Sequence, residues 1–238
     1  MDSLNKTVTS YLERATVYEK KTNWVNMKEC ISPLSPDVFG NGVALDVCAG
    51  TGAVSKALIQ KGWTVISFDA SKAMLSQSEL PMPILGDMHQ LPFLDNFFEI
   101  VVCRQGLQYA DIEMAIAEFK RVCRSQILLG HITREDGDTY SFWQDYFTIA
   151  SPGRKHIFNP NELYHITHNI GLVAKTTQVI KQQDNYVGPL LHLPLNKQTD
   201  LIKLLIDTEK GFKTLYNVQV TTDLITYSNR WEYLVISL

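Results

Sequence analysis

The sequence lacks several features that define large classes of protein. No uninterrupted apolar run approaches the ~20 residues of a membrane-spanning helix. The first residues, MDSLNKTVTS, lack the apolar stretch of a secretory signal peptide, so we expect a cytoplasmic protein with no membrane partner. None of the four cysteines forms a C-x-x-C pair, which argues against a zinc ribbon and a dithiol redox motif. We therefore expect no bound metal, and free thiols in a reducing compartment.

An excess of positive charge is also missing. The chain has 22 basic and 25 acidic side chains and a formal net charge of -3, which does not favour a nucleic-acid partner. Hydrophobic residues make up 45% and charged residues 20%, as in ordinary globular proteins, and this composition excludes disorder. With 238 residues and no internal repeat, we expect one domain spanning residues 1–238.

What is present is an alternation of short apolar runs with helical patterns. Strands are predicted at 43–47, 64–68, 83–85 and 97–103 and from residue 127, and helices at 53–61, after an N-cap at Ser71, and at 113–122. Such alternation is typical of βαβ units, in which a parallel sheet carries helices on both faces. The fold class is therefore predicted to be α/β.

Both ends of the chain differ from this pattern. Apolar residues at helical spacing predict N-terminal cap helices within 1–40, ahead of a core at 41–182. A leucine-rich helical segment at 183–229 precedes a final strand at 230–238. This segment fits a lid, a packing helix or a dimer contact, so the expected state is a monomer or a homodimer.

A glycine-rich turn follows the first predicted strand, in VALDVCAGTGAVS at 43–55. Gly50 and Gly52 allow the backbone to approach a ligand closely because they carry no Cβ. The helix that follows presents free N–H groups at its positive end, which suits a pyrophosphate or a carboxylate. A dinucleotide fingerprint would have a third glycine or alanine where this chain has Ser55.

Three acids follow three successive strands. Asp46 would repel a pyrophosphate but attract an ammonium or sulfonium group. Asp69, at the end of the second strand, can accept hydrogen bonds from two ribose hydroxyls, and Asp87 ends the third strand. Because the carboxyl ends of parallel strands meet at one edge, these acids predict a site for an adenosine-containing, positively charged ligand.

The motifs VALDVCAGTG, the strand ending at Asp69 and GDMHQLPFLDNFFEIVVC resemble the successive signatures of class I S-adenosylmethionine-dependent methyltransferases. The segment EFKRVCRSQILL is similar to that family's stretch between the fourth and fifth strands, and the resemblance covers roughly residues 40–135. The chain is most similar to the small-molecule group that includes the ubiquinone and menaquinone biosynthesis enzymes. This resemblance implies a Rossmann-like, seven-stranded, mostly parallel sheet, with a helical lid before the last strand. It also implies S-adenosyl-L-methionine as cofactor.

The resemblance also implies which residues bind the cofactor. The acid and the turn after the first strand would hold the methionyl end of the cofactor. Residues at the end of the second strand would bind the ribose, those at the end of the third strand the adenine, and those after the fourth strand would lie beneath the sulfonium. A tyrosine of the N-terminal helix would close over them. The implied cofactor-binding residues are Asp46, Cys48, Ala49, Gly50, Thr51, Gly52, Asp69, Ala70, Met74, Asp87, Met88, Arg104, Gln105 and Tyr18.

The chain departs from the family pattern at three places. Cys48 replaces the first glycine of the turn, which is tolerated if its backbone dihedrals are ordinary. The Pro-Gly-Gly turn before the fifth strand is shortened to the sequence RSQ at 124–126. Gln108 and Tyr109 replace a His-His pair after the fourth strand, which removes the histidines from that position.

The predicted reaction is transfer of a methyl group to an O, N or C nucleophile of a small-molecule metabolite, as in small-molecule biosynthesis. His131, expected just past the fifth strand, is the candidate general base, although it fits a strand-end cap equally well. No N/D-P-P-Y/F motif follows the fourth strand, so a flipped nucleic-acid base is not the expected substrate. Two alternatives remain: a cofactor-dependent cyclisation or rearrangement, and a non-catalytic binding subunit.

Overall fold

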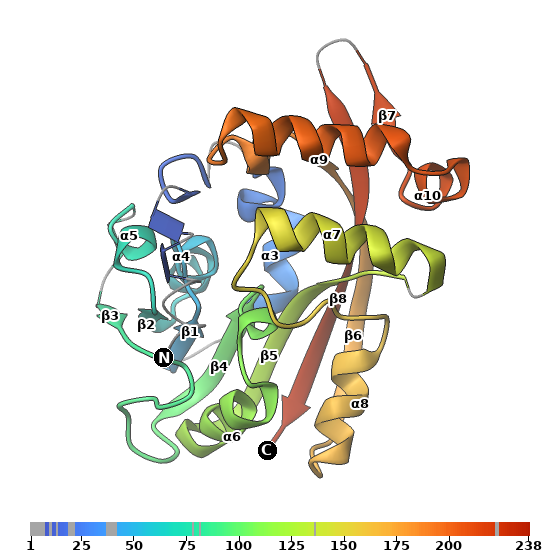
Figure 1. Ribbon diagram of the computed structural model, residues 1–238. Coiled ribbons are helices and arrows are strands. Elements are labelled where there is room, and N and C mark those ends of the chain that lie inside the picture. The colour runs from blue at the N-terminus through green and yellow to red at the C-terminus, as the bar shows by residue number, and fades with distance from the viewer. Residues whose placement is uncertain are drawn as a thin grey trace.

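The protein is built around one twisted sheet, as a computed structural model shows (Figure 1). The structure describes residues 8–9, 11–12, 14–18, 22–36, 42–77, 79–80, 82–135, 137–221 and 224–238. The strands are β1 (Val43–Val47), β2 (Thr64–Asp69), β3 (Pro83–Leu85), β4 (Phe98–Arg104), β5 (Cys123–Thr133), β6 (Ala174–Asn185), β7 (Gln219–Val220) and β8 (Ile225–Ser237).

The strand order is β3-β2-β1-β4-β5-β8-β6, and β7 pairs with β8 beside this path. Strands β1 to β5 pair in parallel, whereas β8 runs antiparallel to both β5 and β6. The predicted α/β class with a mostly parallel sheet is confirmed. The sheet contains the short β7 in addition to the seven strands on its main path.

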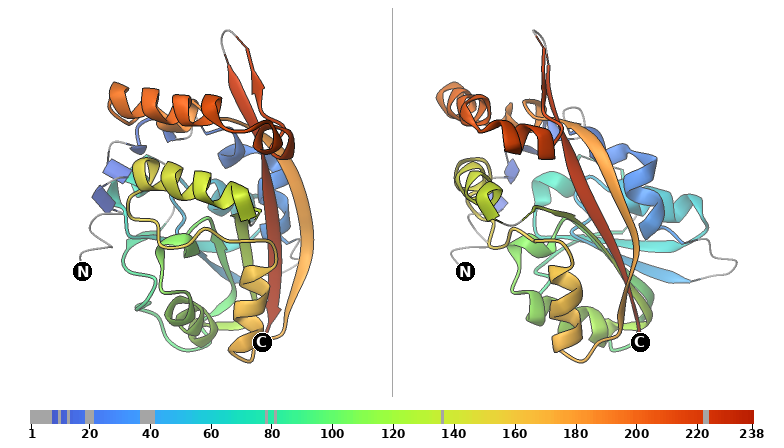
Figure 2. Two further views of the ribbon diagram at one scale, coloured as in Figure 1. Left: turned by 45° about the vertical axis from the view of Figure 1, so that its right-hand side comes forward. Right: turned by 90° about the vertical axis from the view of Figure 1, so that its right-hand side faces the viewer.

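Helices cover both faces of the sheet because side chains of buried strands alternate between two cores. Ala44 of β1 packs toward α3 (Lys28–Ile31) and α4 (Ala53–Gln60). The adjacent Leu45 packs toward α6 (Ile112–Val122) and α8 (Glu162–Asn169) on the other face. The edge-on view in Figure 2 shows these helix pairs on opposite sides of the strands.

Local sequence signals set the ends of the core helices. The Asp111 side chain accepts a hydrogen bond from the Met114 N–H at 3.1 Å and caps α6. Ser71 accepts from the Met74 N–H at 3.3 Å and caps α5 (Lys72–Leu75), as its place after β2 predicts.

The 3₁₀ turns are η1 (Asn23–Asn26), η2 (Ser32–Leu34), η3 (Leu107–Tyr109), η4 (Gly137–Thr139) and η5 (Gly188–Leu190).

A second helical layer lies beyond the carboxyl ends of the parallel strands, at the top of Figure 1. It comprises α7 (Tyr140–Ala150), α9 (Leu195–Asp207) and α10 (Lys210–Leu215), which enclose a hydrophobic cluster of their own. In this cluster Trp143 of α7 packs with Phe212 of α10 and Tyr227 of β8. The layer thus draws on a helix outside the segment that the sequence predicted as the lid.

The predicted boundaries of that segment shift in the structure. β6 extends to Asn185 and β8 begins at Ile225, before residue 230 where the final strand was expected. Residues 225–229 alternate apolar and polar side chains, and they pair with the end of β6, as in Asn185 with Thr226. Because every second residue here is polar, the segment contains no continuous apolar run, and the start of the strand was therefore not predicted.

The expected N-terminal cap helices fall partly outside the described residues. Positions 8–9, 11–12, 14 and 18 have helical backbone, and the Ala15 N–H donates to the Tyr11 carbonyl at 3.0 Å.

Over the described ranges no helix is both long and apolar enough to cross a bilayer.

Candidate functional site

The first cavity opens at the carboxyl ends of β1, β2, β3 and β4, and we call it the strand-end pocket. Its lining residues are Val8, Tyr11, Tyr18, Cys48, Gly50, Phe68, Asp69, Ala70, Ser71, Met74, Gly86, Asp87, Met88, His89, Arg104, Gln105, Gly106 and Tyr109.

Asp69 links the glycine turn to the end of β2. One carboxylate oxygen accepts from the Gly50 N–H at 2.8 Å, and the other accepts from the Ser71 N–H at 2.8 Å. Burial raises the pKa of Asp69, although these backbone donors act in the opposite direction. Asp69 lines the pocket, and its carboxylate has lone pairs left that can accept from a diol.

Asp46 lies in a smaller hollow that adjoins the strand-end pocket at Cys48, Gly50 and Arg104, and we call it the Asp46 hollow. The side chain is 1% exposed, and its Oδ2 accepts from Ser55 Oγ at 2.6 Å. Burial raises the pKa of Asp46 to about 6, while the Ser55 hydroxyl and the Arg104 charge lower it. Ser55, which breaks the dinucleotide fingerprint, therefore orients this carboxylate.

Arg104 lines both the strand-end pocket and the Asp46 hollow. Its Nη2 donates to the Val25 carbonyl at 2.9 Å, and its guanidinium carbon lies 5.2 Å from the centre of the Trp24 ring. Its buried Nη1 has no hydrogen-bond partner among the described residues. A buried donor without a partner is costly, so it favours a ligand oxygen at this point.

The glycine turn contains a backbone feature that the sequence analysis did not predict. Cys48 has φ of 59°, in the left-handed region, so the condition of ordinary dihedrals that was set for a cysteine at this position is not met. A Cβ at Gly106 would lie 2.5 Å from the Cys48 sulfur, which explains why the next loop passes there with a glycine.

All but one of the other predicted cofactor residues line one of these two cavities. Ala49 and Thr51 line the Asp46 hollow, whereas Ala70, Met74, Asp87, Met88, Gln105 and Tyr18 line the strand-end pocket. Gly52 lines neither cavity. It is the N-cap of α4 with φ of 84°, and a Cβ there would meet Leu80 at 2.3 Å, so its role is in packing.

At the end of β3, Asp87 is paired with a neighbouring histidine. Nδ1 of His89 lies 2.6 Å from Asp87 Oδ1, and His89 Nε2 accepts from the Asp111 N–H at 2.9 Å. Because Nε2 accepts, the ring proton is on Nδ1 and is donated to Asp87. The pair fixes the loop that carries Met88 into the pocket.

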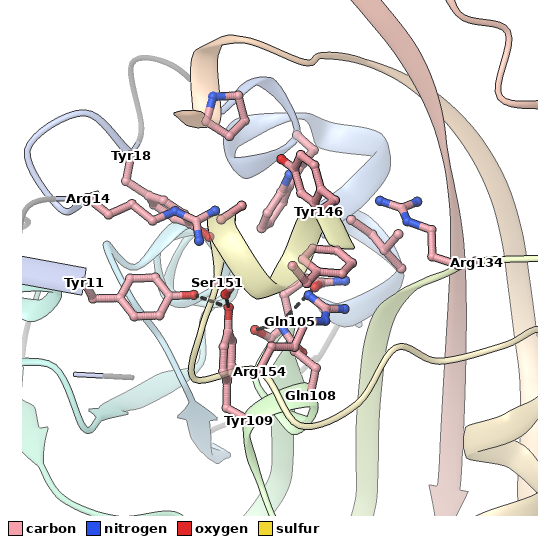
Figure 3. A pocket seen from close by; sticks show the side chains of 15 residues that line it. Tyr11, Arg14, Tyr18, Gln105, Gln108, Tyr109, Arg134, Tyr146, Ser151 and Arg154 are labelled. Carbon is pink, nitrogen blue, oxygen red and sulfur yellow. Dashed lines mark hydrogen bonds between the residues drawn. The ribbon is translucent and has the colours of Figure 1, made fainter. Parts of the chain in front are cut away.

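A second cavity, the arginine pocket, adjoins the first under α7 (Figure 3). It is lined by Tyr11, Arg14, Tyr18, Trp24, Gln105, Gln108, Tyr109, Ile132, Arg134, Tyr146, Phe147, Ala150, Ser151, Arg154 and Pro189. Tyr11, Tyr18, Gln105 and Tyr109 line both the arginine pocket and the strand-end pocket. The two cavities therefore share a wall.

Tyr109 stands in this shared wall with its hydroxyl held on both sides. Tyr11 donates to Tyr109 Oη at 3.1 Å, and Ser151 Oγ lies 2.8 Å from the same oxygen (Figure 3). Burial alone would raise the pKa of Tyr109, but the charges of Arg14 and Arg154 and these hydrogen bonds lower it below its ordinary value. A tyrosine in such surroundings can accept a proton.

His131, the predicted general base, lies away from this wall. It is 3% exposed in β5, its ring packs edge-on against Phe158 at 5.2 Å, and it lines neither pocket. Burial lowers the pKa of His131 to about 3, helped by the charge of Arg230. Its Nε2 is 3.7 Å from Glu232 Oε2, too far for a hydrogen bond. The structure does not bring His131 to the site, so we assign it no catalytic role.

The sequence analysis missed the residues that define the arginine pocket. Arg134 directly follows β5, so the strand-end logic that found three acids applied to it as well. Tyr109 was noted only as a replacement for a histidine, although a polar residue at that position was itself a signal. Arg14 and Arg154 carry no local signal, because only tertiary packing brings them to the pocket.

Comparison with known proteins adds a family to this geometry. The family model described as a methyltransferase domain matches residues 45–129, which contain most of β1, all of β2 to β4 and most of β5. This segment is therefore similar to a methyltransferase domain. The resemblance found in the sequence is confirmed over residues 45–129. The strands of this segment end at the strand-end pocket.

Relatives extend the similarity beyond the methyltransferase domain. A malonyl-[acyl-carrier protein] O-methyltransferase of Buchnera aphidicola is 33% identical over 127 residues, 51% of each chain. A demethylmenaquinone methyltransferase of Thermobifida fusca is 32% identical over 149 residues, 56% of this chain and 63% of that protein. The chain thus spans about half the length of the curated relatives it matches.

Solved structures support the fold over a longer stretch. The YcgJ protein of Bacillus subtilis superposes with a TM-score of 0.72 at 18% identity, covering 83% of this chain and 92% of that one. At this identity the likeness concerns the fold, which includes the sheet beyond the methyltransferase domain.

Proposed function

We propose that the protein transfers the methyl group of S-adenosylmethionine to an O, N or C nucleophile of a small molecule. The observation that carries this proposal is the shared wall: a donor-type cavity at the strand ends meets a second cavity at Tyr109. The relatives named above are methyltransferases, which favours this activity over a rearrangement or a non-catalytic role.

The residues of the strand-end pocket fit the proposed cofactor group by group. Asp69 would accept from the ribose hydroxyls, and the loop of Asp87 and Met88 would border the adenine. In the Asp46 hollow the ionised carboxylate attracts the amino group of the methionyl end. The unpartnered Nη1 of Arg104 would donate to the carboxylate of that same end.

The cofactor, once bound, supplies a methyl carbon activated by a sulfonium. The protein then has to align the acceptor with that carbon and remove a proton where the acceptor carries one. Tyr109 is the group we propose as proton acceptor, because its hydroxyl stands in the wall and its pKa is lowered. Tyr11, which donates to Tyr109, would stabilise the phenolate form.

The first test is calorimetric titration with S-adenosylmethionine, using NAD as a control ligand. We expect binding of S-adenosylmethionine alone. Asp69→Ala should weaken this binding by about 1–3 kcal/mol, because hydrogen bonds to a charged group are lost. Asp95→Ala, a matched change at an exposed acid ion-paired with Arg121, should leave it unchanged. Binding of NAD instead, or equal affinities of wild type and Asp69→Ala, would refute the assignment.

A further inference from the structure

The charged residues that line the arginine pocket all carry the same sign. They are Arg14, Arg134 and Arg154, and no acid lines the pocket in the described part of the chain. They come from the N-terminal segment, the residue after β5 and the loop after α7, so the fold brings together three distant segments. In a chain of net charge -3 this concentration of positive charge does not follow from composition.

The faces of these guanidinium groups are covered by aromatic rings. The distances run from the guanidinium carbon to the ring centre. They are 3.8 Å from Arg134 to Trp143 and 4.0 Å from Arg154 to Phe147. From Arg14 to Tyr11 the distance is 5.3 Å. Stacking on an aromatic ring leaves the N–H groups at the edge of a guanidinium available to a planar or tetrahedral anion. Figure 3 shows Arg14 and Arg134 entering from opposite sides, with Tyr146 between them.

Part of this donor capacity is unused. Arg134 is 3% exposed, and its Nε has no hydrogen-bond partner within the described ranges; the same is true of Arg14 Nε. Arg154 Nε donates to the His156 carbonyl at 2.8 Å, which fixes its orientation. The structure records no ion pair between any of the three and a carboxylate of a described residue.

The electrostatics agree with this geometry. Burial, together with the charges of Arg134 and Arg14, lowers the pKa of Arg154 to about 10, although the nearby tyrosines act in the opposite direction. The buried acid Asp184 influences Tyr146 and Tyr227 but does not line the pocket, and its Oδ2 accepts from Asn229 at 3.1 Å. Buried cations without a counter-charge are costly, and a bound anion offsets that cost.

We infer that the acceptor molecule carries an oxyanion, a carboxylate or a phosphate, which Arg14, Arg134 and Arg154 hold in the arginine pocket. The inference rests on the proposed function for the statement that this ligand is the acceptor. With its anion held by the three guanidinium groups, the molecule presents a separate hydroxyl or amine toward Tyr109. Three cations against one anion leave the pocket positive, so Tyr109 keeps the surroundings that favour its phenolate.

The test is calorimetry on the full chain saturated with S-adenosylhomocysteine, using three probes. Benzoate and inorganic phosphate represent the two oxyanions, and benzamide has the shape of benzoate without its charge. We expect at least one of the two anions to bind, and benzamide to bind about tenfold more weakly or less. Benzamide binding as tightly as the better anion, or no binding of either anion, would overturn the inference.

Variants assign the binding to these residues. Arg134→Gln and Arg154→Gln should each weaken anion binding about tenfold or more, and Arg134→Lys should restore part of it. Arg124→Gln, a matched change at a half-exposed arginine paired with Glu99, should have no effect. Equal anion affinities for Arg154→Gln and Arg124→Gln would contradict the inference. S-adenosylhomocysteine binding checks each variant's fold.

The two proposals fail separately. If S-adenosylhomocysteine does not bind the wild-type chain, the proposed function fails, while the same anion titrations without it still test the oxyanion site. If it binds and the anions do not, only the present inference fails.

Discussion

The strand-end pocket and the arginine pocket touch each other but have opposite electrostatic character. In the first, Asp69 and Asp87, with Asp46 in the adjoining hollow, outnumber the single Arg104, whereas the charged residues of the second are all arginines. The first is built by consecutive strand ends, and the second by segments far apart in the chain. The cationic end of a donor and the anionic end of an acceptor would thus each meet the charge that attracts it.

The largest effect is expected at the glycine turn of the strand-end pocket. Gly50 has φ of 58°, and a Cβ there would lie 3.3 Å from Met74 Cε, so Gly50→Val should abolish S-adenosylmethionine binding. Gly171→Val is the matched control, because Gly171 has φ of 75° with nothing near its Cβ and lies outside both pockets. Calorimetry together with circular dichroism checks both; normal binding by Gly50→Val would remove the close-approach argument.

The shared wall is tested next. Tyr109→Phe keeps the ring but removes the hydroxyl, and we expect turnover to fall roughly 100-fold with little change in donor affinity. Its rate should also lose the rise with pH that the wild-type phenol confers, measured as kcat from pH 6 to 9. Tyr164→Phe, on α8 away from both pockets, is the control. Unchanged kcat in Tyr109→Phe would leave the wall with a positioning role only.

A smaller effect is expected in the pH dependence of donor binding, which Asp46 should control. Because burial raises the pKa of Asp46 to about 6, its carboxylate is mostly protonated at pH 5 and mostly ionised at pH 7. The ionised form attracts the donor's ammonium, so donor affinity should rise about tenfold between these values. Asp46→Asn should flatten this dependence in calorimetric titrations. A parallel slope in wild type and variant would assign the titration to another group.

The smallest expected effect concerns His131, which belongs to neither pocket. Its pKa is about 3 in the fold, so below pH 6.5 the unfolded chain binds a proton that the native state does not. The free energy of unfolding should therefore fall as pH decreases from about 6.5 toward 3. In His131→Gln this slope should be shallower, and in His165→Gln, at an exposed site on α8, it should match wild type. Urea unfolding at several pH values measures how the free energy of unfolding depends on pH. Identical slopes for wild type and His131→Gln would contradict the lowered pKa of His131.

The difference between the pockets explains what could be predicted from sequence. Asp46, Asp69 and Asp87 each follow a short apolar run, and parallel strands place such residues together by rule. The left-handed backbone of Cys48 was not predictable, because a side chain at that position normally indicates ordinary dihedrals. His131 was misjudged because an apolar run does not reveal where a strand ends: β5 continues to Thr133, so the histidine is inside the sheet.

The arginine pocket depends on contacts that no local pattern encodes. Arg154 reaches it because the backbone N–H groups of Lys155 and His156 both donate to the Gln108 carbonyl, tying that loop to η3. The aromatic residues of α7 serve both as core and as pocket lining. Trp143 packs in the core of the helical layer, whereas Tyr146 and Phe147 also face the arginine pocket.

The four residues common to both cavities have a thermodynamic consequence. A ligand that orders Tyr11, Tyr18, Gln105 and Tyr109 from one side changes the surface that the other ligand meets. Linkage then requires reciprocity: whatever factor an acceptor adds to donor affinity, the donor adds to acceptor affinity. If donor and acceptor bind as proposed, the partition between the cavities would couple the two binding equilibria.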